Sequence, residues 1–233
     1  YPIYSHFSGE SVRLTFDNYC GTEAITINKT SLLINDEFIA VTFKGSSSVT
    51  IPAGERIISD EINCEVKART IFFVSFYLED YTQMRSMVYA SGPLSTGIYA
   101  ISDCTSEKEI PINISRNTNN FYFLSNVSVL TENTNRCIVC YGDSITAQDW
   151  PDYLALRCFT EGYGKTAVIR RATSGSRILR EYHCLTYESY GLMGSNRFAH
   201  EVPTDGADVV IIQQGINDII HPVGEEVNVF RPM

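Results

Sequence analysis

The sequence lacks any long hydrophobic run, any excess of basic residues and any regular cysteine spacing. A helix that crosses a membrane needs about 20 consecutive apolar residues, and no stretch of the chain reaches that length, so we expect no membrane span. Lys and Arg number 18 against 27 Asp and Glu, which gives a formal net charge of -9. Proteins that bind nucleic acid through its phosphates ordinarily carry a basic surface. We therefore expect no nucleic-acid partner.

Seven cysteines are scattered along the chain, at positions 20, 64, 104, 137, 140, 158 and 184. An odd and irregular set argues against a disulfide framework. It favours a reducing compartment such as the cytoplasm, with secretion left open. Cys137 and Cys140 have the CxxC spacing of metal and redox sites, but they lie in an apolar run typical of a strand. Because strand residues three apart face opposite sides, we interpret both as core residues and expect no metal or organic cofactor.

The first half of the chain consists of short runs in which apolar and polar residues alternate, separated by Gly, Pro, Asn and Ser. Such runs occur at residues 12–16, 39–43, 48–51, 70–78, 87–89 and 121–124. Alternation with a period of two is typical of strands that bury one face, and no helical period is evident in this half. We predict an all-β, jelly-roll-like sandwich domain over residues 1–134.

Strands and helices alternate after the polar stretch at residues 131–136. Apolar runs typical of buried parallel strands occur at residues 138–141, 167–171 and 207–213. Pro151 is placed to open a helix over residues 150–157, and a less regular, partly helical segment covers about residues 178–199. This order predicts an open α/β sheet over residues 135–233, with functional residues at the carboxyl ends of its strands.

Each of the three predicted parallel strands is followed by a short polar segment that contains glycine. These segments are Gly142-Asp143-Ser144-Ile145-Thr146, Ala172-Thr173-Ser174-Gly175-Ser176-Arg177 and Gln214-Gly215-Ile216-Asn217-Asp218. We expect Ser144 to lie on a strand-to-helix turn, with an exposed hydroxyl beside the free N–H groups of a helix N-terminus. Gly175 has no Cβ and can bring its N–H close to a substrate, and the Asn217 amide can point to the same atom. Together the three residues would form an oxyanion hole.

These segments resemble the sequence blocks of the SGNH hydrolases, the GDSL-like esterases named for the Ser, Gly, Asn and His of four blocks. Gly142-Asp143-Ser144-Ile145 is similar to the nucleophile block, Ser174-Gly175 to the glycine block and Gly215-Ile216-Asn217-Asp218 to the GxND block. The first half resembles, more loosely, the β-sandwich found ahead of some bacterial SGNH domains. The resemblance implies a flavodoxin-like second domain in which Ser144 attacks an ester carbonyl. It also implies that the N–H groups of Ser144 and Gly175 and the Asn217 amide hold the oxyanion.

The base that activates the serine is the part that the resemblance does not supply. In the family, this base is the His of a DxxH block near the C-terminus of the domain. His221 follows the GxND block too closely for that place, and His183 and His200 precede the third parallel strand. We therefore expect the chain to stop before the DxxH block, so that the α/β domain is incomplete and a further C-terminal segment or a second chain completes it. The chain alone should then be nearly inactive.

Three functional hypotheses follow. The first is a carboxylic ester hydrolase acting on small-molecule or acetylated carbohydrate esters. The second is a glycan-binding β-sandwich attached to an inert hydrolase-like domain, which a solvent-exposed row of aromatic residues on one sheet face would favour. The third treats the sandwich as a scaffold for the hydrolase domain.

Overall fold

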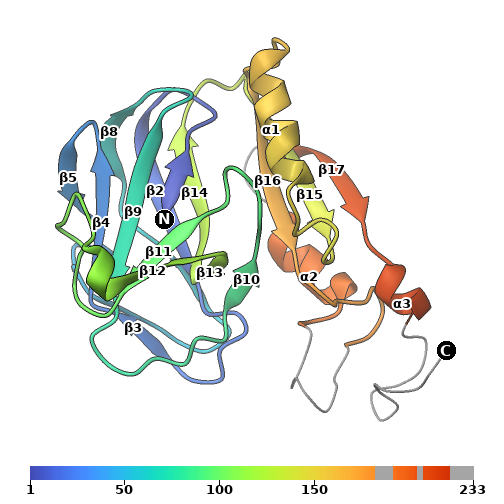
Figure 1. The fold of residues 1–233 in the computed structure, drawn as a ribbon, viewed down its shortest axis with the longest axis horizontal. Coiled ribbons are helices and arrows are strands. Elements are labelled where there is room, and N and C mark those ends of the chain that lie inside the picture. The colour runs from blue at the N-terminus through green and yellow to red at the C-terminus, as the bar shows by residue number, and fades with distance from the viewer. Residues whose placement is uncertain (182–190, 204–206, 221–233) are drawn as a thin grey trace. The chain divides into compact units, whose positions relative to one another are not determined.

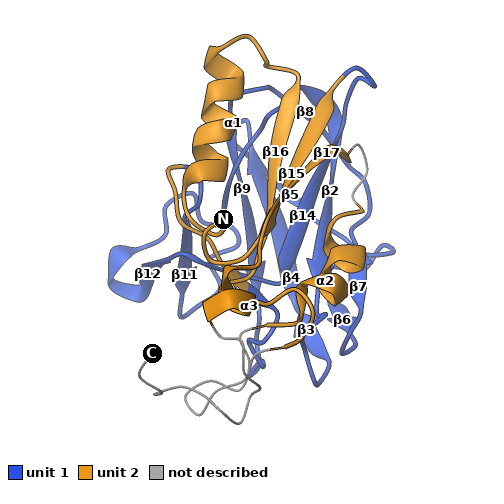
Figure 2. Ribbon diagram, turned by 90° about the vertical axis from the view of Figure 1, so that its right-hand side faces the viewer, with its two compact units in different colours: residues 1–87, 94–134 blue, residues 88–93, 135–233 orange. Residues whose placement is uncertain are grey.

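The computed structural model describes residues 1–181, 191–203 and 207–220 (Figure 1). The chain forms two compact units (Figure 2): unit 1 comprises residues 1–87 and 94–134, and unit 2 comprises residues 88–93 and 135–233. Each unit has a hydrophobic core of its own.

Unit 1 consists almost wholly of antiparallel strands (Figure 1). One sheet has the strand order β1-β9-β4-β5, and a second has the order β14-β2-β7, with β8 also paired to β2. The strands of the first sheet are β1 (Pro2–Tyr4), β9 (Ile71–Tyr77), β4 (Lys29–Ile34) and β5 (Glu37–Ala40). Those of the second are β14 (Leu124–Leu130), β2 (Gly9–Asp17), β7 (Arg56–Ile58) and β8 (Ile62–Val66).

Shorter elements complete this half of the chain. Two antiparallel pairs join β3 (Ile25–Ile27) to β6 (Val49–Ile51) and β11 (Gly97–Ala100) to β12 (Ser115–Thr118). The remaining elements are β10 (Met87–Tyr89), the 3-10 helix η1 (Ile112–Ile114) and β13 (Asn120–Tyr122).

The core of unit 1 follows from alternation along its strands. The two larger sheets share one apolar core, to which β2 contributes Val12, Leu14 and Phe16, β4 contributes Leu32 and Ile34, and β9 contributes Phe72 and Val74. The strands predicted at residues 12–16 and 70–78 are thereby confirmed. The run at residues 39–43 is a strand only as far as Ala40. Val41 and Phe43 are buried in the following loop, where Lys44 and Gly45 have positive φ angles of 52° and 80° and turn the chain.

Unit 2 contains a parallel sheet with the strand order β16-β15-β17 (Figure 1). Its strands are β15 (Arg136–Gly142), β16 (Thr166–Ala172) and β17 (Ala207–Gln213), and its helices are α1 (Trp150–Thr160), α2 (Gly194–Glu201) and α3 (Ile216–Ile220). The predicted strands and the predicted helix after residue 150 are confirmed. Gly142 pairs with Ala172 on one side and with Gln213 on the other. All three strands therefore end at the same level of the sheet.

The two cysteines of the CxxC sequence are both buried in β15. Cys137 belongs to the core cluster with Val139, Tyr141 and Val202. Burial raises the pKa of the Cys137 thiol to about 11 and that of Cys140 to about 12. Both thiols are thus protonated at neutral pH, which is the behaviour of core residues rather than of reactive thiolates.

Strand β17 differs from its two neighbours because every one of its residues is exposed. Within the described residues it pairs with β15 alone and forms the edge of the sheet. Val209 and Ile212 are 51% and 60% exposed. A parallel strand ordinarily buries both of its faces, so β17 has the sequence of a central strand in the position of an edge strand.

Candidate active site

The turn after β15 is organised by Asp143. Its Oδ1 accepts a hydrogen bond from the N–H of Ile145 at 3.0 Å, and its carbonyl accepts one from the N–H of Ala147 at 3.0 Å. Asp143 is itself buried, and its Oδ2 has no hydrogen-bond partner among the described residues. These contacts show that Asp143 orients the turn.

Ser144 lies inside this turn and is half-buried. Its hydroxyl makes no hydrogen bond to any residue that the structure describes. The expectation that Ser144 stands at a helix N-terminus is wrong, because helix α1 begins only at Trp150. The backbone N–H groups near Ser144 therefore belong to the turn that Asp143 holds and not to the first turn of a helix.

Two glycines meet backbone constraints that few other residues could satisfy. A Cβ on Gly142 would lie 2.2 Å from the carbonyl oxygen of Gln213 and 2.3 Å from Oγ1 of Thr146. Gly142 thus allows the ends of β15 and β17 to approach each other. Gly175 has a φ angle of 77°, in the left-handed region that disfavours side chains. The loop after β16 consequently depends on glycine at the position that the sequence singled out.

Ser176 connects the second and third polar segments. The side-chain amide of Asn217 donates to the Ser176 carbonyl at 3.1 Å, and Nε2 of Gln214 donates to the Ser176 hydroxyl at 3.0 Å. Asp218 accepts from the N–H of Ile178 through both carboxylate oxygens, at 3.1 and 2.9 Å. Ser176 and Asn217 are both buried. The segments after β16 and β17 are therefore held together by buried hydrogen bonds.

Arg197 connects the first segment to the same network. Its Nη2 donates to the Gly142 carbonyl at 3.0 Å and to the Ser176 hydroxyl at 3.3 Å. Its Nη1 pairs with Glu201 at 2.5 Å, and its guanidinium lies 4.8 Å from the centre of the Tyr141 ring. Arg197 is only 3% exposed. One guanidinium on α2 thus bridges the end of β15 and the loop after β16.

Tyr141 supports Arg197 from the strand below the turn. Its hydroxyl donates to the Gly194 carbonyl at 2.5 Å, and burial raises the pKa of this phenol to about 12. Tyr141 therefore remains a neutral hydrogen-bond donor at neutral pH, and its ring presents a face to the Arg197 cation.

The sequence singled out Ser144, Gly175 and Asn217. It placed Ser176 and Gln214 in the polar segments without giving either a role, and it gave no indication of Arg197. Hydrogen bonds join Gly142, Ser176 and Asn217, one residue from each of the three predicted segments, into one network through Arg197. The Asn217 amide uses one of its donors on the Ser176 carbonyl. Nothing in the local pattern indicated Arg197, because a charged residue on a helix is usually exposed.

The expectation that the chain stops before a DxxH block needs a correction that the sequence itself supplies. Asp218-Ile219-Ile220-His221 has the DxxH spacing, so the chain does contain such a sequence. The Asp218 carboxylate already accepts a hydrogen bond from the N–H of Ile178. His221 and His183 lie outside the described residues, and His200 lies in the last turn of α2. The described structure thus assigns no base to Ser144.

Two further features of the described residues bear on the type of site. They contain no group of three or more His, Cys, Asp or Glu side chains that could hold a metal ion. Among the helices in this part of the chain, none combines the length and apolarity needed to cross a membrane.

Comparisons with known proteins give a weak structural similarity only. No family model matches the chain, and no curated protein matches it in sequence. A family 2 carbohydrate esterase from Corynascus thermopiles (Myceliophthora fergusii), solved with a carbohydrate binding domain, is similar with a TM-score of 0.32 and 15% identity over 91% of this chain and 59% of that one. A family 2 carbohydrate esterase from Clostridium thermocellum, in complex with cellohexaose, is similar with a TM-score of 0.27 and 15% identity over 93% of this chain and 62% of that one. The chain thus spans about three fifths of the length of these structural neighbours, both of which are carbohydrate esterases.

Proposed function

We propose that unit 2 carries the nucleophile and oxyanion part of an SGNH-type carboxylic ester hydrolase. One observation carries this proposal. Strands β15, β16 and β17 end at the same level of the sheet, and hydrogen bonds through Ser176 and Arg197 connect the polar segments that follow them. We also propose that unit 1 is a jelly-roll-like β-sandwich and that unit 2 is an incomplete flavodoxin-like domain. The strand order β16-β15-β17 is the 2-1-3 order found in flavodoxin-like sheets.

In the proposed reaction, the Ser144 hydroxyl attacks the carbonyl carbon of an ester and a base takes its proton. The negative charge that develops on the carbonyl oxygen is held by the N–H groups of Ser144 and Gly175 and by the second N–H of the Asn217 amide. Collapse of this intermediate expels the alcohol, which receives the proton from the base. Water then attacks the acyl-Ser144 carbonyl while the base takes a proton from it. The base returns that proton to the Ser144 oxygen as the carboxylic acid leaves.

The base in this proposal is a histidine outside the described residues. His221 and His183 are candidates within the chain, and a further segment or chain could supply another. A serine hydroxyl without a positioned base reacts slowly, since general-base assistance contributes roughly 10² to 10⁴ in rate. If another segment or chain supplies the base, the 233-residue chain alone should hydrolyse simple esters roughly 10² to 10⁴ times more slowly than the complete site does.

The proposed substrates are carboxylic esters, with acetylated carbohydrates as the leading class. Both structural neighbours bear the name of carbohydrate esterases, and this chain would share their class of substrate. The alternative is that unit 2 is inert and that the protein only binds glycans through unit 1.

Covalent labelling with a fluorophosphonate probe, followed by peptide mass mapping, tests the proposal. The label should appear on Ser144 and disappear in Ser144→Ala, while Ser47→Ala, an exposed serine in unit 1, should leave it unchanged. Asn217→Ala should lower kcat for p-nitrophenyl acetate by roughly 10² to 10³, the usual loss for one oxyanion donor. Label on another serine, or ester turnover that Ser144→Ala leaves intact, would contradict the proposal.

The same assay identifies the base. If His221 serves Ser144, then His221→Ala should slow both labelling and turnover by roughly 10² to 10⁴. Rates that His221→Ala and His183→Ala both leave unchanged would place the base outside these two positions.

A further inference from the structure

The sheet β1-β9-β4-β5 of unit 1 has an unusually apolar outer face. Along β9, Phe72 and Val74 are buried in the core, so the alternate residues Phe73 and Ser75 face the other side. An antiparallel sheet with one face on a core ordinarily presents polar residues on the other face. Phe73 instead remains 44% exposed there.

Cross-strand pairing extends this apolar character over all four strands. Phe73 pairs with Pro2 of β1 and with Leu33 of β4, and Leu33 pairs in turn with Phe38 of β5. Directly paired residues lie on the same face of a sheet. The four residues therefore form a continuous apolar row across the outer face.

A segment of the same unit forms a wall beside this row. Asp103 forms an ion pair with Lys29, Ser31 donates to the Thr105 carbonyl at 2.5 Å, and Lys108 pairs with Asp36 at 3.1 Å. The three contacts join residues 103–108 to β4 and to the turn that follows it. The wall is thus attached at several points, and the space between it and the sheet is preformed.

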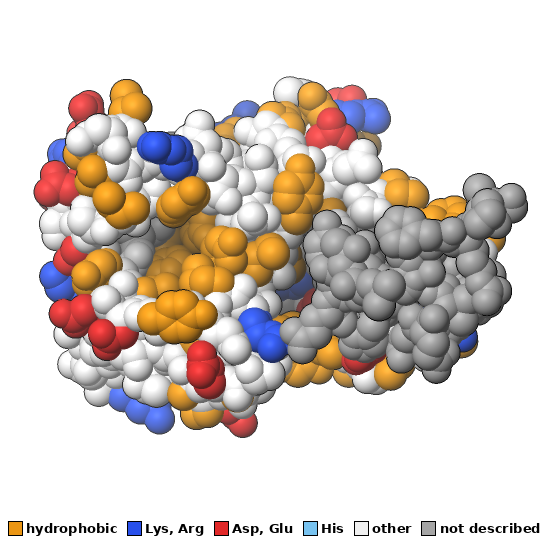
Figure 3. Space-filling view, turned by 60° about the horizontal axis from the view of Figure 1, so that its bottom comes forward, with side chains coloured by type: hydrophobic (Ala, Val, Ile, Leu, Met, Phe, Trp, Pro, Cys, Tyr) orange, Lys and Arg blue, Asp and Glu red, His pale blue; other side chains and the backbone are white. Residues whose placement is uncertain are grey.

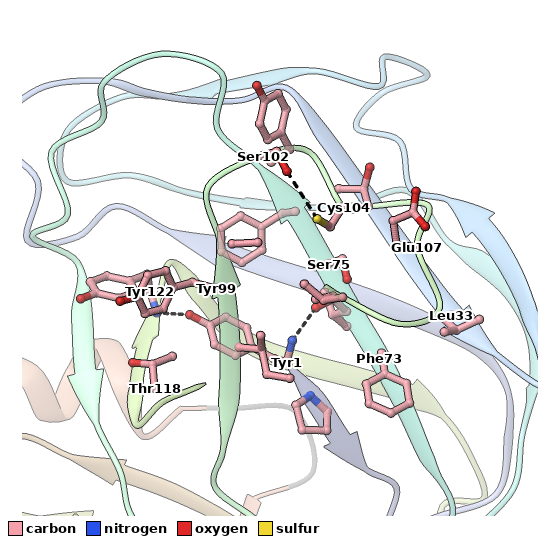
Figure 4. A pocket seen from close by; sticks show the side chains of 18 of the residues that line it. Tyr1, Leu33, Phe73, Ser75, Tyr99, Ser102, Cys104, Glu107, Thr118 and Tyr122 are labelled. Carbon is pink, nitrogen blue, oxygen red and sulfur yellow. Dashed lines mark hydrogen bonds between the residues drawn. The ribbon is translucent and has the colours of Figure 1, made fainter. Parts of the chain in front are cut away.

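This space is a cleft of about 1120 Å³, larger than the roughly 300 to 1,000 Å³ of a typical small-molecule site. Figure 3 shows a hollow lined with hydrophobic side chains, and Figure 4 shows Tyr1, Tyr99 and Tyr122 beside one another in it, with Phe73 and Leu33 further along. Six lining residues are large, apolar and exposed: Phe38, Phe73, Met84, Ile98, Tyr99 and Ile101. A gathering of exposed apolar side chains in one hollow is typical of a ligand-binding groove.

The charged residues of the lining restrict the occupant. Glu79, Glu107 and Glu109 line the cleft, and the single lysine there, Lys108, is paired with Asp36. Carboxylates repel phosphates and acidic sugars, but they accept hydrogen bonds from hydroxyl groups. Aromatic faces pack against the C–H faces of sugar rings, whose hydroxyls point outward to such acceptors.

We propose that this cleft binds a neutral oligosaccharide, with Tyr99 and Phe73 contacting its sugar rings and the glutamates accepting its hydroxyl groups. The cleft volume of about 1120 Å³ exceeds that of a typical small-molecule site and suits more than one sugar ring. The site lies in unit 1, apart from Ser144, Gly175 and Asn217 in sequence and unit, so it does not depend on the esterase proposal.

Affinity electrophoresis in gels containing neutral polysaccharides, hydroxyethylcellulose and xylan in separate gels, tests the proposal on the whole chain. Migration should be retarded in at least one gel, and polygalacturonate should give no retardation. Tyr99→Ala and Phe73→Ala should each weaken binding about tenfold, the loss expected for one aromatic contact together with its buried area. Tyr81→Ala is the matched control, because Tyr81 is 94% exposed and does not line the cleft.

Ser144→Ala should bind as tightly as the unchanged chain, which separates this site from the proposed esterase site. Absence of retardation in both neutral gels would overturn the proposal. So would retardation that Tyr99→Ala and Phe73→Ala leave unchanged, or stronger retardation by polygalacturonate. Unchanged circular dichroism spectra of the two variants would show that any loss reflects the contact and not unfolding.

Discussion

The two units differ most in the size of their apolar cores and in the charged residues that they bury. Unit 1 buries an apolar core in which Leu14, Leu32 and Val74 have no exposed surface. Unit 2 has a small apolar cluster and buries polar groups at the carboxyl ends of its strands, among them Arg177, Arg197, Ser176 and Asn217. Apolar burial stabilises in proportion to area, whereas buried polar groups must be hydrogen-bonded to avoid a cost. Unit 1 therefore depends mainly on apolar burial, whereas unit 2 depends more on hydrogen bonds and ion pairs between buried polar groups.

The largest effect should come from opening the core of unit 1. Phe16 is fully buried, and its ring packs against those of Phe43 and Phe76 at centroid distances of 5.9 and 5.4 Å. Phe16→Ala should lower the free energy of unfolding by about 3 to 5 kcal/mol, as measured by urea denaturation. Ile112→Ala, which truncates a residue that is 89% exposed, should change it by less than about 0.5 kcal/mol. A small effect of Phe16→Ala would mean that this core is not closely packed.

The next effect should come from a buried ion pair in unit 2. Arg170 and Asp152 pair at 2.6 Å, and their side chains are 11% and 10% exposed. Arg170→Ala leaves the Asp152 carboxylate buried without that partner and should cost about 3 kcal/mol or more. Arg157→Ala breaks the exposed pair between α1 and Glu161, the residue after its end, and should cost less than about 1 kcal/mol. Equal costs in thermal unfolding would contradict the assignment of a buried polar framework to unit 2.

Arg197→Lys should lower stability less than Phe16→Ala or Arg170→Ala does. Its main effect should be on the reactivity of Ser144. A lysine keeps the charge but cannot donate to Gly142, Ser176 and Glu201 in the same fixed geometry. The expected loss of stability is about 1 to 3 kcal/mol, and the rate of fluorophosphonate labelling at Ser144 should fall while the binding of neutral polysaccharide is unchanged. If the labelling rate stays constant although stability falls, Arg197 supports the fold and does not position Ser144.

The smallest effect should be a pH dependence of the wall beside the cleft. The hydrogen bond from Lys29, followed by that from Thr105, lowers the pKa of Asp103 to about 2. Because the folded-state pKa lies below the usual value of about 3.9, this contribution is complete above pH 4 and is lost as the pH falls toward 2. Hydrogen exchange at the N–H of Thr105, which donates to Asp103, should therefore accelerate in that range. Asp103→Asn should remove the pH dependence, and an unchanged profile in that variant would assign it to another group.

Local patterns predicted much of the architecture. The strands at residues 12–16 and 70–78, the three parallel strands and helix α1 were all indicated by alternation, apolar runs and Pro151. The run at residues 121–124 was predicted as one strand, but Phe123 has a φ angle of 58° and separates β13 from β14. A buried aromatic residue with positive φ is not foreseeable from period and composition. The same limit applies to the turn at Ser144, whose hydrogen bonds to Asp143 take the place of a helix start.

The sequence by itself determined the order of strands and helices and the positions of the three polar segments, because period, composition and strand ends are local properties. Only the tertiary structure decided that Arg197 and Ser176 bridge those segments, and that Pro2, Phe73, Leu33 and Phe38 form one row. These outcomes depend on the register between strands and on the packing of α2, which join residues far apart in the chain. Whether a charged side chain such as Arg197 is buried, or an aromatic side chain such as Phe73 is exposed, depends on these distant neighbours.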